Sequence, residues 1–374
     1  MSKIKFIIKK IFKFAVIFIF NIMKLMPLNK NLIILDSWKG EKLRGSLTSI
    51  YEQLILKNKL EVVVIGERNK LSNKNVKICK SKSIKHMYYL AVAKFWIVDT
   101  IYYDYFKPRK DTKYILVWHA PGAFKSFGIS TVNNAEQLKK VYINNGKNLS
   151  HLIISSEEIK SIYSKELCIN EEKILSLGLP RTDKFVKTDY SIKEKIYAKY
   201  NMSTNTKLIL YAPTFRGEGI SEFKLNFDLN EINQNLSQSY KIIVKLHPNN
   251  YLYKFDSDKK IIISKDDNLE ELMKASDLMI TDYSSIIFEY CLLEKPILFY
   301  AYDLKNYLYD GRGFYINYKD FVPGPISYNT RQLVKNINSY DFDIYREKIK
   351  TLSDKYQIHD GRCTDRFIEY FFLQ

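Results

Sequence analysis

Cysteine, glycine and proline are all scarce in this chain of 374 residues, which contains only 4 Cys, 13 Gly and 9 Pro. The cysteines lie far apart and form no Cys-x-x-Cys pair: Cys79, Cys168, Cys291 and Cys363. This argues against a zinc site or a disulfide framework and fits reduced, structural thiols in a cytosolic protein. With 46% hydrophobic and 14% aromatic residues, the chain is not disordered, and it is long enough for two domains with separate cores.

Acidic residues are also in deficit, since 59 Lys and Arg face 41 Asp and Glu, a formal net charge of +18. Such a charge indicates an anionic partner. The sequence has no zinc-finger, RNP-type or helix-turn-helix signature, which argues against nucleic acid. An anionic membrane surface or an anionic polymer is the favoured partner.

A long apolar run is missing as well. The longest near the N-terminus, residues 14–20, is well short of the ~20 residues that a membrane span needs. The polar residues of this segment are Lys5, Lys9, Lys10, Lys13, Asn21 and Lys24. On a helix they all fall within an arc of roughly 160°. Residues 1–28 are therefore expected to form an amphipathic helix, peripheral on the cytoplasmic face of the membrane.

The N-terminal segment has two other interpretations. A secretory signal peptide is disfavoured because no small-residue cleavage site follows at residues 26–30. A tilted span over residues 4–26 would bury several lysines, and this alternative stays open.

Short β-branched runs alternate with helical patterns in two series. The expected strands are residues 32–35, 62–65, 95–98, 114–118, 152–154 and 174–177, then 208–211, 242–246, 261–263, 278–280 and 297–300. Continuous apolar runs suit parallel strands that are covered on both faces. The fold class is therefore α/β, with two Rossmann-like doubly wound domains. The strand signal is lost around residues 187–206, so the domains are expected to cover residues 29–190 and 191–374.

Residues 280–303 are the most informative stretch. A strand ends near Ile280, Asp282 and the pair Ser284 and Ser285 can cap a helix, and Glu289 follows one turn later. A helix start with two hydroxyls suits a phosphate, and the carboxylate could take a ribose diol. Taken alone, an ordinary serine-capped helix is the simpler interpretation.

The wider pattern resembles the CDP-glycerol glycerophosphotransferase family, the polyol-phosphate transferases of teichoic acid and some capsule synthesis. The blocks that carry the resemblance are residues 118–125, 178–183, 211–216, 245–248 and 280–303, in the family's order, with continuations at 313–315 and 323–325 and a weaker echo at 359–361. The resemblance covers roughly residues 110–365, and several ordered blocks are more specific than any single motif.

The resemblance implies a GT-B fold, in which two Rossmann-like domains face a central cleft. It implies transfer of glycerol phosphate or ribitol phosphate from a CDP-activated donor to a hydroxyl of a lipid-linked or polymer acceptor, with release of CMP. Two departures concern the substrate. Glu289 stands where Asp is commoner, and Ala-Pro-Gly-Ala-Phe follows His119 where Gly-Thr-Pro-Leu is more usual, which leans toward the ribitol branch.

His119 is the expected general base, since it follows a strand of the first domain and can titrate near neutrality. Lys125, six residues later, is expected to hold the acceptor's phosphate. For His119 the alternative is a structural histidine bonded to the loop backbone. Arg181 is a further acceptor contact, although for Arg181 and Asp183 a domain-closing salt bridge fits the sequence equally well.

On the donor side the resemblance assigns His247 to the diphosphate, where it would stabilise the leaving CMP. Arg216 offers a planar fork for phosphate oxygens, unless it belongs to a structural ion pair. The remaining expected donor contacts are Thr214, Ser284, Ser285, Glu289 and Arg312. Asp282 is expected to brace its turn rather than to react.

No aspartate pair of the kind that binds a sugar-nucleotide metal stands out, so no obligatory cofactor is expected, with Mg²⁺ at most a counter-ion of the diphosphate. Three other functions are alternatives to polyol-phosphate transfer. A GT-B glycosyltransferase using a nucleotide sugar fits the His119 loop less well. A nucleic-acid-binding protein would leave His119, His247 and the serine pair without a purpose, and the intact motif set argues against an inactive scaffold.

Overall fold

The computed structural model describes residues 3–37, 40, 42–56, 60–66, 76–101, 106–131, 136–187, 189–216, 222–223, 225–246, 252–253, 260–264, 266–310 and 313–373. The chain divides into two compact units. The first comprises Met1–Gly122, Phe127–Lys184 and Ile358–Gln374, and the second comprises Ala123–Ser126 and Phe185–Gln357.

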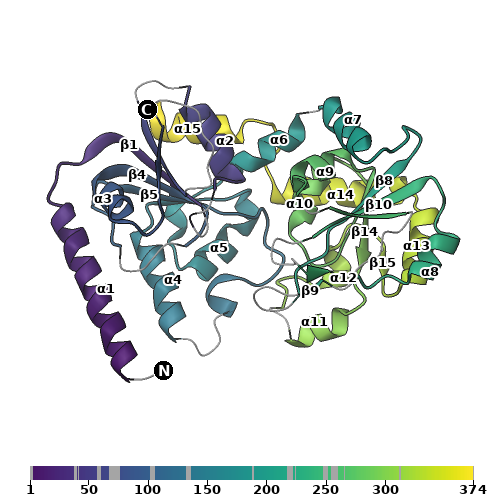
Figure 1. Cartoon of the computed structure of the whole chain (residues 1–374), viewed down its shortest axis with the longest axis horizontal. Coiled ribbons are helices and arrows are strands. Elements are labelled where there is room, and N and C mark those ends of the chain that lie inside the picture. Colours follow the sequence, from purple (N-terminus) through teal and green to yellow (C-terminus); the bar gives the residue numbers. More distant parts are fainter. Residues whose placement is uncertain are drawn as a thin grey trace. The chain divides into compact units, whose positions relative to one another are not determined.

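The first unit is built on a parallel sheet of seven strands in the order β3-β2-β1-β4-β5-β6-β7. Figure 1 labels β1, β4 and β5 of this sheet. The strands are β1 Asn29–Asp36, β2 Glu61–Ile65, β3 Val76–Cys79, β4 Ala93–Val98, β5 Lys113–Val117, β6 His151–Ile153 and β7 Ile174–Leu175. Its helices are α1 Lys3–Met23, α2 Ser46–Leu54, α3 Ile84–Val92, α4 Glu136–Asn148, α5 Lys160–Leu167 and α15 Cys363–Phe372. The short helix α6, Asp183–Val186, spans the boundary between the units.

The second unit has a parallel sheet of six strands in the order β12-β10-β8-β13-β14-β15, and a separate two-stranded pair, β11-β9. The strands are β8 Lys207–Tyr211, β9 Glu222–Phe223, β10 Tyr240–Lys245, β11 Leu252–Tyr253, β12 Ile261–Ser264, β13 Leu278–Thr281, β14 Ile297–Tyr300 and β15 Ile326–Ser327. Its helices are α7 Tyr190–Lys199, α8 Leu229–Asn235, α9 Leu269–Ala275, α10 Ile286–Cys291, α11 Leu304–Asp310, α12 Tyr318–Phe321, α13 Thr330–Asn338 and α14 Phe342–Tyr356.

The predicted α/β class with two parallel sheets is confirmed, and every predicted strand is present. Four strands were not predicted: β3, β9, β11 and β15. β9, β11 and β15 have two residues each, too few for a pattern. β3 lies at the sheet edge, and its two middle residues, Lys77 and Ile78, are both exposed, so it lacks the continuous buried run of the central strands.

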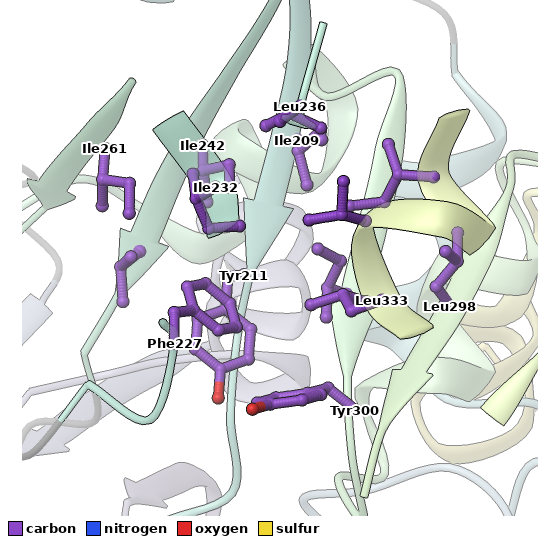
Figure 2. Close-up of a cluster of buried hydrophobic side chains, with 14 of the residues drawn as sticks. Ile209, Tyr211, Phe227, Ile232, Leu236, Ile242, Ile261, Leu298, Tyr300 and Leu333 are labelled. Atoms are coloured by element: carbon purple, nitrogen blue, oxygen red, sulfur yellow. The ribbon is translucent and has the colours of Figure 1, made fainter. Parts of the chain in front are cut away.

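Each sheet has apolar side chains packed against its helices. In the second unit, Figure 2 shows Ile209 and Tyr211 of β8, Ile242 of β10 and Leu298 of β14 gathered with Leu333 of α13. The equivalent cluster of the first unit joins β1, β2, β4 and β5 to α2 and α15. In each unit, one buried cluster packs the covering helices against the central strands. This packing fixes the position of the carboxyl ends of those strands.

The C-terminal helix α15 belongs to the first unit, which corrects the expected bounds of 29–190 and 191–374. Asp183 accepts hydrogen bonds from the N–H groups of Cys363 and Thr364, at 2.8 and 2.7 Å, and from the Thr364 hydroxyl at 2.6 Å. These are the unpaired donors of a helix start, so Asp183 caps α15. Gly178 has a φ of +78° and packs on Cys363 so closely that a Cβ would overlap its Sγ. Figure 1 shows α15, in yellow, beside α2.

The N-terminal segment is helical as expected, and α1 docks on the first unit through Phe20. This ring is 1% exposed and lies 4.9 Å from the ring of Phe106 and 6.5 Å from that of Trp96. Other apolar residues face outward, among them Phe12, Phe14 and Leu25, which are 70, 72 and 84% exposed. Within the described part of the chain, no helix combines the length and the hydropathy that a membrane crossing requires.

Candidate active site

Each sheet reverses its direction of strand addition at one point: between β1 and β4 in the first unit, and between β8 and β13 in the second. Ligands of doubly wound sheets bind beyond the carboxyl ends of the strands at such a point. The segments there carry Asp36, Ser37 and Asp99 in the first unit and Thr214 and Asp282 in the second.

In the first unit, His119 lies just beyond β5 and is hydrogen-bonded to the backbone beyond β4. Its Nδ1 is 3.2 Å from the carbonyl oxygen of Asp99. A carbonyl only accepts, so Nδ1 carries the proton and donates, and in the neutral imidazole Nε2 has the lone pair. The residue keeps exposed surface. The alternative named for His119 was a structural role, in which the ring bonds to the backbone. The hydrogen bond to Asp99 is such a bond, but it also orients the ring so that the lone pair of Nε2 can accept a proton.

Asp99 organises this edge of the sheet and was missed by the sequence analysis. Its carboxylate is buried, accepts from the Ser37 hydroxyl at 2.8 Å and lies 3.5 Å from Nε of Arg44. Beside it, the buried Asp36 lies 3.4 Å from Nε2 of His86. The signal that could have found Asp99 is its position directly after a buried strand, where a carboxylate has no packing role.

The pKa of His119 is lowered from its ordinary value. Desolvation by the surrounding protein is the largest cause, and the cations of Arg181 and Arg44 act in the same direction. The hydrogen bond to Asp99 and the charge of its carboxylate oppose the shift. His119 is therefore neutral, and able to accept a proton, at neutral pH.

Arg181 is hydrogen-bonded to the His119 loop. Its Nη1 donates to the carbonyl oxygen of His119 at 2.6 Å, and its backbone N–H donates to Oγ of Ser46 at 3.4 Å. Asp183, as described, caps α15. Neither contact is a domain-closing salt bridge, and Arg181 fixes the backbone that carries His119.

Lys125 belongs to the second unit and not to that of His119. Its backbone forms an antiparallel bridge with Phe314, and next to it the N–H of Ser126 donates to the carbonyl of Gly313 at 3.1 Å. Phe124 anchors the segment, since its ring stacks on that of Phe321 at 4.6 Å and 16°. The predicted contact of Lys125 with the acceptor stays a prediction.

In the second unit, Asp282 ties the end of β13 to the end of β8. It is 0% exposed, and its Oδ1 accepts from the N–H groups of Thr214 and Tyr283, at 2.8 and 2.5 Å. The carbonyl of Asp282 accepts from the hydroxyl of Tyr318 at 3.1 Å. This agrees with the expectation that Asp282 braces the turn.

Arg216 lies between two carboxylates. Its Nη2 is 2.8 Å from Oδ2 of Asp282, and its Nε and Nη2 donate to Asp303 at 2.8 and 3.0 Å. Burial alone would lower the pKa of Arg216, but the hydrogen bond to Asp303 and both negative charges raise it instead. The guanidinium also lies 5.1 Å from the ring centre of Tyr283. Arg216 therefore has the geometry of a structural ion pair, which was the alternative named for it. Any contact of Arg216 with a phosphate would compete with the two carboxylates.

Ser284 and Ser285 precede the short helix α10, and both are half-buried. Ser285 makes no capping hydrogen bond with its side chain, and Oγ of Ser284 accepts from the N–H of Ile286 at only 3.4 Å. Both hydroxyls are thus weakly engaged in capping. Glu289 lies one turn further on and is 3% exposed.

Two cavities lie beyond β14, next to this cluster. One has a volume of about 470 Å³ and is lined by Tyr302, Asp303, Lys305, Lys319 and Tyr328, among others. The second, of about 480 Å³, is formed by residues between Leu304 and Lys319. Either is large enough for part of a nucleotide, and both were absent from the sequence analysis because no motif marks them.

His247 and Arg312 lie outside the described residues. Within the described ranges, no group of three or more His, Cys, Asp or Glu is arranged to hold a metal ion. The expectation that no metal is obligatory stays a prediction.

Comparison with known proteins identifies relatives along nearly the whole chain. The teichoic acid ribitol-phosphate primase of Bacillus spizizenii is 32% identical over 365 residues, covering 92% of both chains. The teichoic acid glycerol-phosphate primase of Bacillus subtilis is 35% identical over 300 residues, covering 77% of this chain and 75% of the relative. The chain spans 58% of a third relative, the teichoic acid poly(ribitol-phosphate) polymerase of Bacillus spizizenii.

Among solved structures, the wall teichoic acid polymerase TagF matches with a TM-score of 0.84 at 23% identity, covering 99% of this chain and 98% of the other. This likeness supports the GT-B-like fold class. The family model for CDP-glycerol:poly(glycerophosphate) glycerophosphotransferase matches residues 18–373. The chain therefore belongs to the CDP-glycerol:poly(glycerophosphate) glycerophosphotransferase family.

Proposed function

We propose that this protein transfers a polyol phosphate, glycerol phosphate or ribitol phosphate, from a CDP-activated donor to an acceptor hydroxyl in teichoic acid or capsular polymer synthesis. The observation that carries the proposal is the family match along residues 18–373. The names of the relatives, which are teichoic acid primases, transferases and polymerases, support the same chemistry.

In the proposed reaction the acceptor hydroxyl attacks the phosphorus that bears the polyol. The new bond joins the acceptor oxygen to that phosphorus, the bond to the bridging diphosphate oxygen breaks, and CMP leaves with its electron pair. The hydroxyl proton passes to Nε2 of His119, the nitrogen that keeps its lone pair while Nδ1 donates to Asp99. The rest of catalysis is positioning and neutralisation of the diphosphate charge.

The first unit is assigned to the acceptor and the second to the CDP-polyol. Ser284 and Ser285 are proposed to donate to the diphosphate, since their hydroxyls are weakly engaged in capping. Thr214 and Glu289 are proposed as further donor contacts, the latter at the ribose, and so are His247 and Arg312. Arg216 is proposed to act mainly by holding Asp282 and Asp303 in place.

The acceptor is proposed to be lipid-linked, and the protein to be attached to the cytoplasmic face of the membrane through α1. The exposed Phe12, Phe14 and Leu25, together with the exposed Lys10 and Lys13, support an interfacial helix. Any Mg²⁺ is proposed to act as a counter-ion of the diphosphate only.

The experiment that tests the roles is His119→Ala. Calorimetry should show nearly unchanged binding of CDP-polyol, while transfer to a lipid-linked acceptor is lost, because the proposed base acts on the acceptor. His151→Ala is a matched control, since His151 lies at the start of β6. Near-normal turnover of the His119 variant on its acceptor would remove His119 from catalysis.

A further inference from the structure

A basic cavity lies at the amino edge of the first sheet, the edge opposite to His119. Its volume is about 770 Å³. Lys107, Arg109 and Lys110 reach it from the loop before β5, and Lys113 from the first residue of that strand. Lys24, Lys147 and Lys173 complete the cationic lining, and no Asp or Glu is among the described residues that line it.

Backbone carbonyls hold several of these cations in place without neutralising them. Nζ of Lys173 donates to the carbonyls of Leu149 and Lys147 at 3.0 and 3.4 Å, and Nζ of Lys24 donates to that of Lys107 at 3.3 Å. Arg109 donates through Nη2 to the carbonyl of Met26, and its Nε is buried without a hydrogen-bond partner among the described residues. In the described part of the chain, none of the lining cations forms an ion pair.

The repulsion among these cations affects the pKa of Lys24. Burial lowers its pKa first, and the charges of Lys107 and Arg109 lower it further. An anion in the cavity would relieve the repulsion. The arrangement therefore favours a negatively charged ligand.

The surroundings of the cavity indicate which anion it takes. Lys24 directly follows α1, and next to it Leu25 and Met26 are 84 and 45% exposed. A ligand with a phosphate in the cavity and hydrocarbon beside Leu25 would satisfy both features. A soluble phosphate or a free polymer segment would use the charges but leave the apolar residues in water.

We propose that this cavity binds the phosphate of an anionic phospholipid headgroup and so orients the protein on the membrane. The proposal rests on the membrane attachment proposed above. It adds that anionic lipid is selected by a defined pocket and not by the diffuse positive charge of the whole protein.

The test is vesicle binding of the full-length chain with a charge-matched control. Lys110→Gln with Lys113→Gln removes two exposed cations from the cavity, and Lys140→Gln with Lys165→Gln removes two exposed cations elsewhere in the same unit. On vesicles containing phosphatidylglycerol the cavity variant should bind about tenfold more weakly than wild type, and the control within about twofold. On phosphatidylcholine alone the three proteins should bind alike. Equal losses of affinity for phosphatidylglycerol vesicles in the cavity variant and the control variant would contradict the proposed lipid pocket.

Two further measurements separate the other outcomes. If glycerol phosphate or inorganic phosphate binds wild type in calorimetry as tightly as the vesicles do, and not the cavity variant, the ligand is a soluble anion and the lipid proposal is wrong. CMP release with a soluble acceptor is followed on the same proteins, and the cavity variant should keep wild-type turnover. If the wild-type protein releases no CMP but still binds phosphatidylglycerol vesicles selectively, the proposed reaction is contradicted and the lipid pocket is not.

Discussion

Arg216 and Asp303 are joined by two parallel hydrogen bonds, from Nε to Oδ2 at 2.8 Å and from Nη2 to Oδ1 at 3.0 Å. The same guanidinium pairs with Asp282, whose side chain is 1% exposed. One arginine thus compensates two carboxylates that follow β13 and β14. The arginine of the block 211–216 is therefore already engaged by two carboxylates of the protein.

Removing this arginine should destabilise the second unit. Arg216→Gln leaves the buried Asp282 uncompensated. For a fully buried pair this costs about 3–5 kcal/mol of unfolding free energy, and the cost should lie toward the lower end here because the Arg216 side chain is 30% exposed. Asp303→Asn should cost less, because its side chain is 20% exposed. The two effects should be coupled in a double-mutant cycle measured by urea unfolding. Arg346→Gln, in an exposed pair with Asp343, is the control and should change little. Additive effects of Arg216→Gln and Asp303→Asn would contradict the pairing.

The pH dependence of transfer should follow the charges around His119. A general base works only when deprotonated, so activity is lost as pH falls through its lowered pKa. Arg44→Gln removes a cation that lowers this pKa, so the acid limb of kcat/KM should move to higher pH. Asp99→Asn removes a charge that raises it, so the limb should move to lower pH. Shifts of the same sign in both variants would exclude His119 as the group that titrates.

The serine pair should affect binding more than stability. Ser284→Ala with Ser285→Ala removes almost no capping, so the unfolding midpoint should hardly change. Affinity for CDP-polyol should fall by about 1–3 kcal/mol if both hydroxyls donate to the diphosphate. The exposed pair Ser237→Ala with Ser239→Ala is the control. An affinity loss that only tracks a loss of stability would reduce the serines to helix caps.

Asp183 should hold the C-terminal helix on the first unit. Asp183→Ala removes three hydrogen bonds to residues 363 and 364, and we expect a local loss of about 2 kcal/mol. Amide hydrogen exchange in α15 should accelerate accordingly. Asp189→Ala removes the exposed cap of α7 and should leave α15 unchanged. Unaltered exchange in α15 after Asp183→Ala would contradict the capping role.

The features that could be predicted from the sequence are those that depend on the pattern of neighbouring residues. Continuous β-branched runs located the central strands, because buried parallel strands have no polar face to interrupt them. The ordered blocks at their carboxyl ends identified the loops that carry His119, Thr214, Ser284 and Ser285. These features need only neighbouring residues.

Contacts between distant positions could not be predicted. Asp303 lies 87 positions from Arg216, and no motif marks it as a partner. Asp183 and Cys363 are separated by 180 positions, so the return of α15 to the first unit was missed and the domain bounds were wrong. Asp99 had no signal beyond its place after a strand. In each case tertiary packing brings the carboxylate to its donors.

The central claim is the identity of the donor, and the most direct measurement is CMP release from CDP-glycerol, CDP-ribitol and a nucleotide sugar offered separately with a lipid-linked acceptor. The account predicts CMP release and acceptor extension with at least one of the two CDP-polyols, loss of both in His119→Ala, and no turnover of the nucleotide sugar. Turnover of the nucleotide sugar, with neither CDP-polyol consumed, would contradict it.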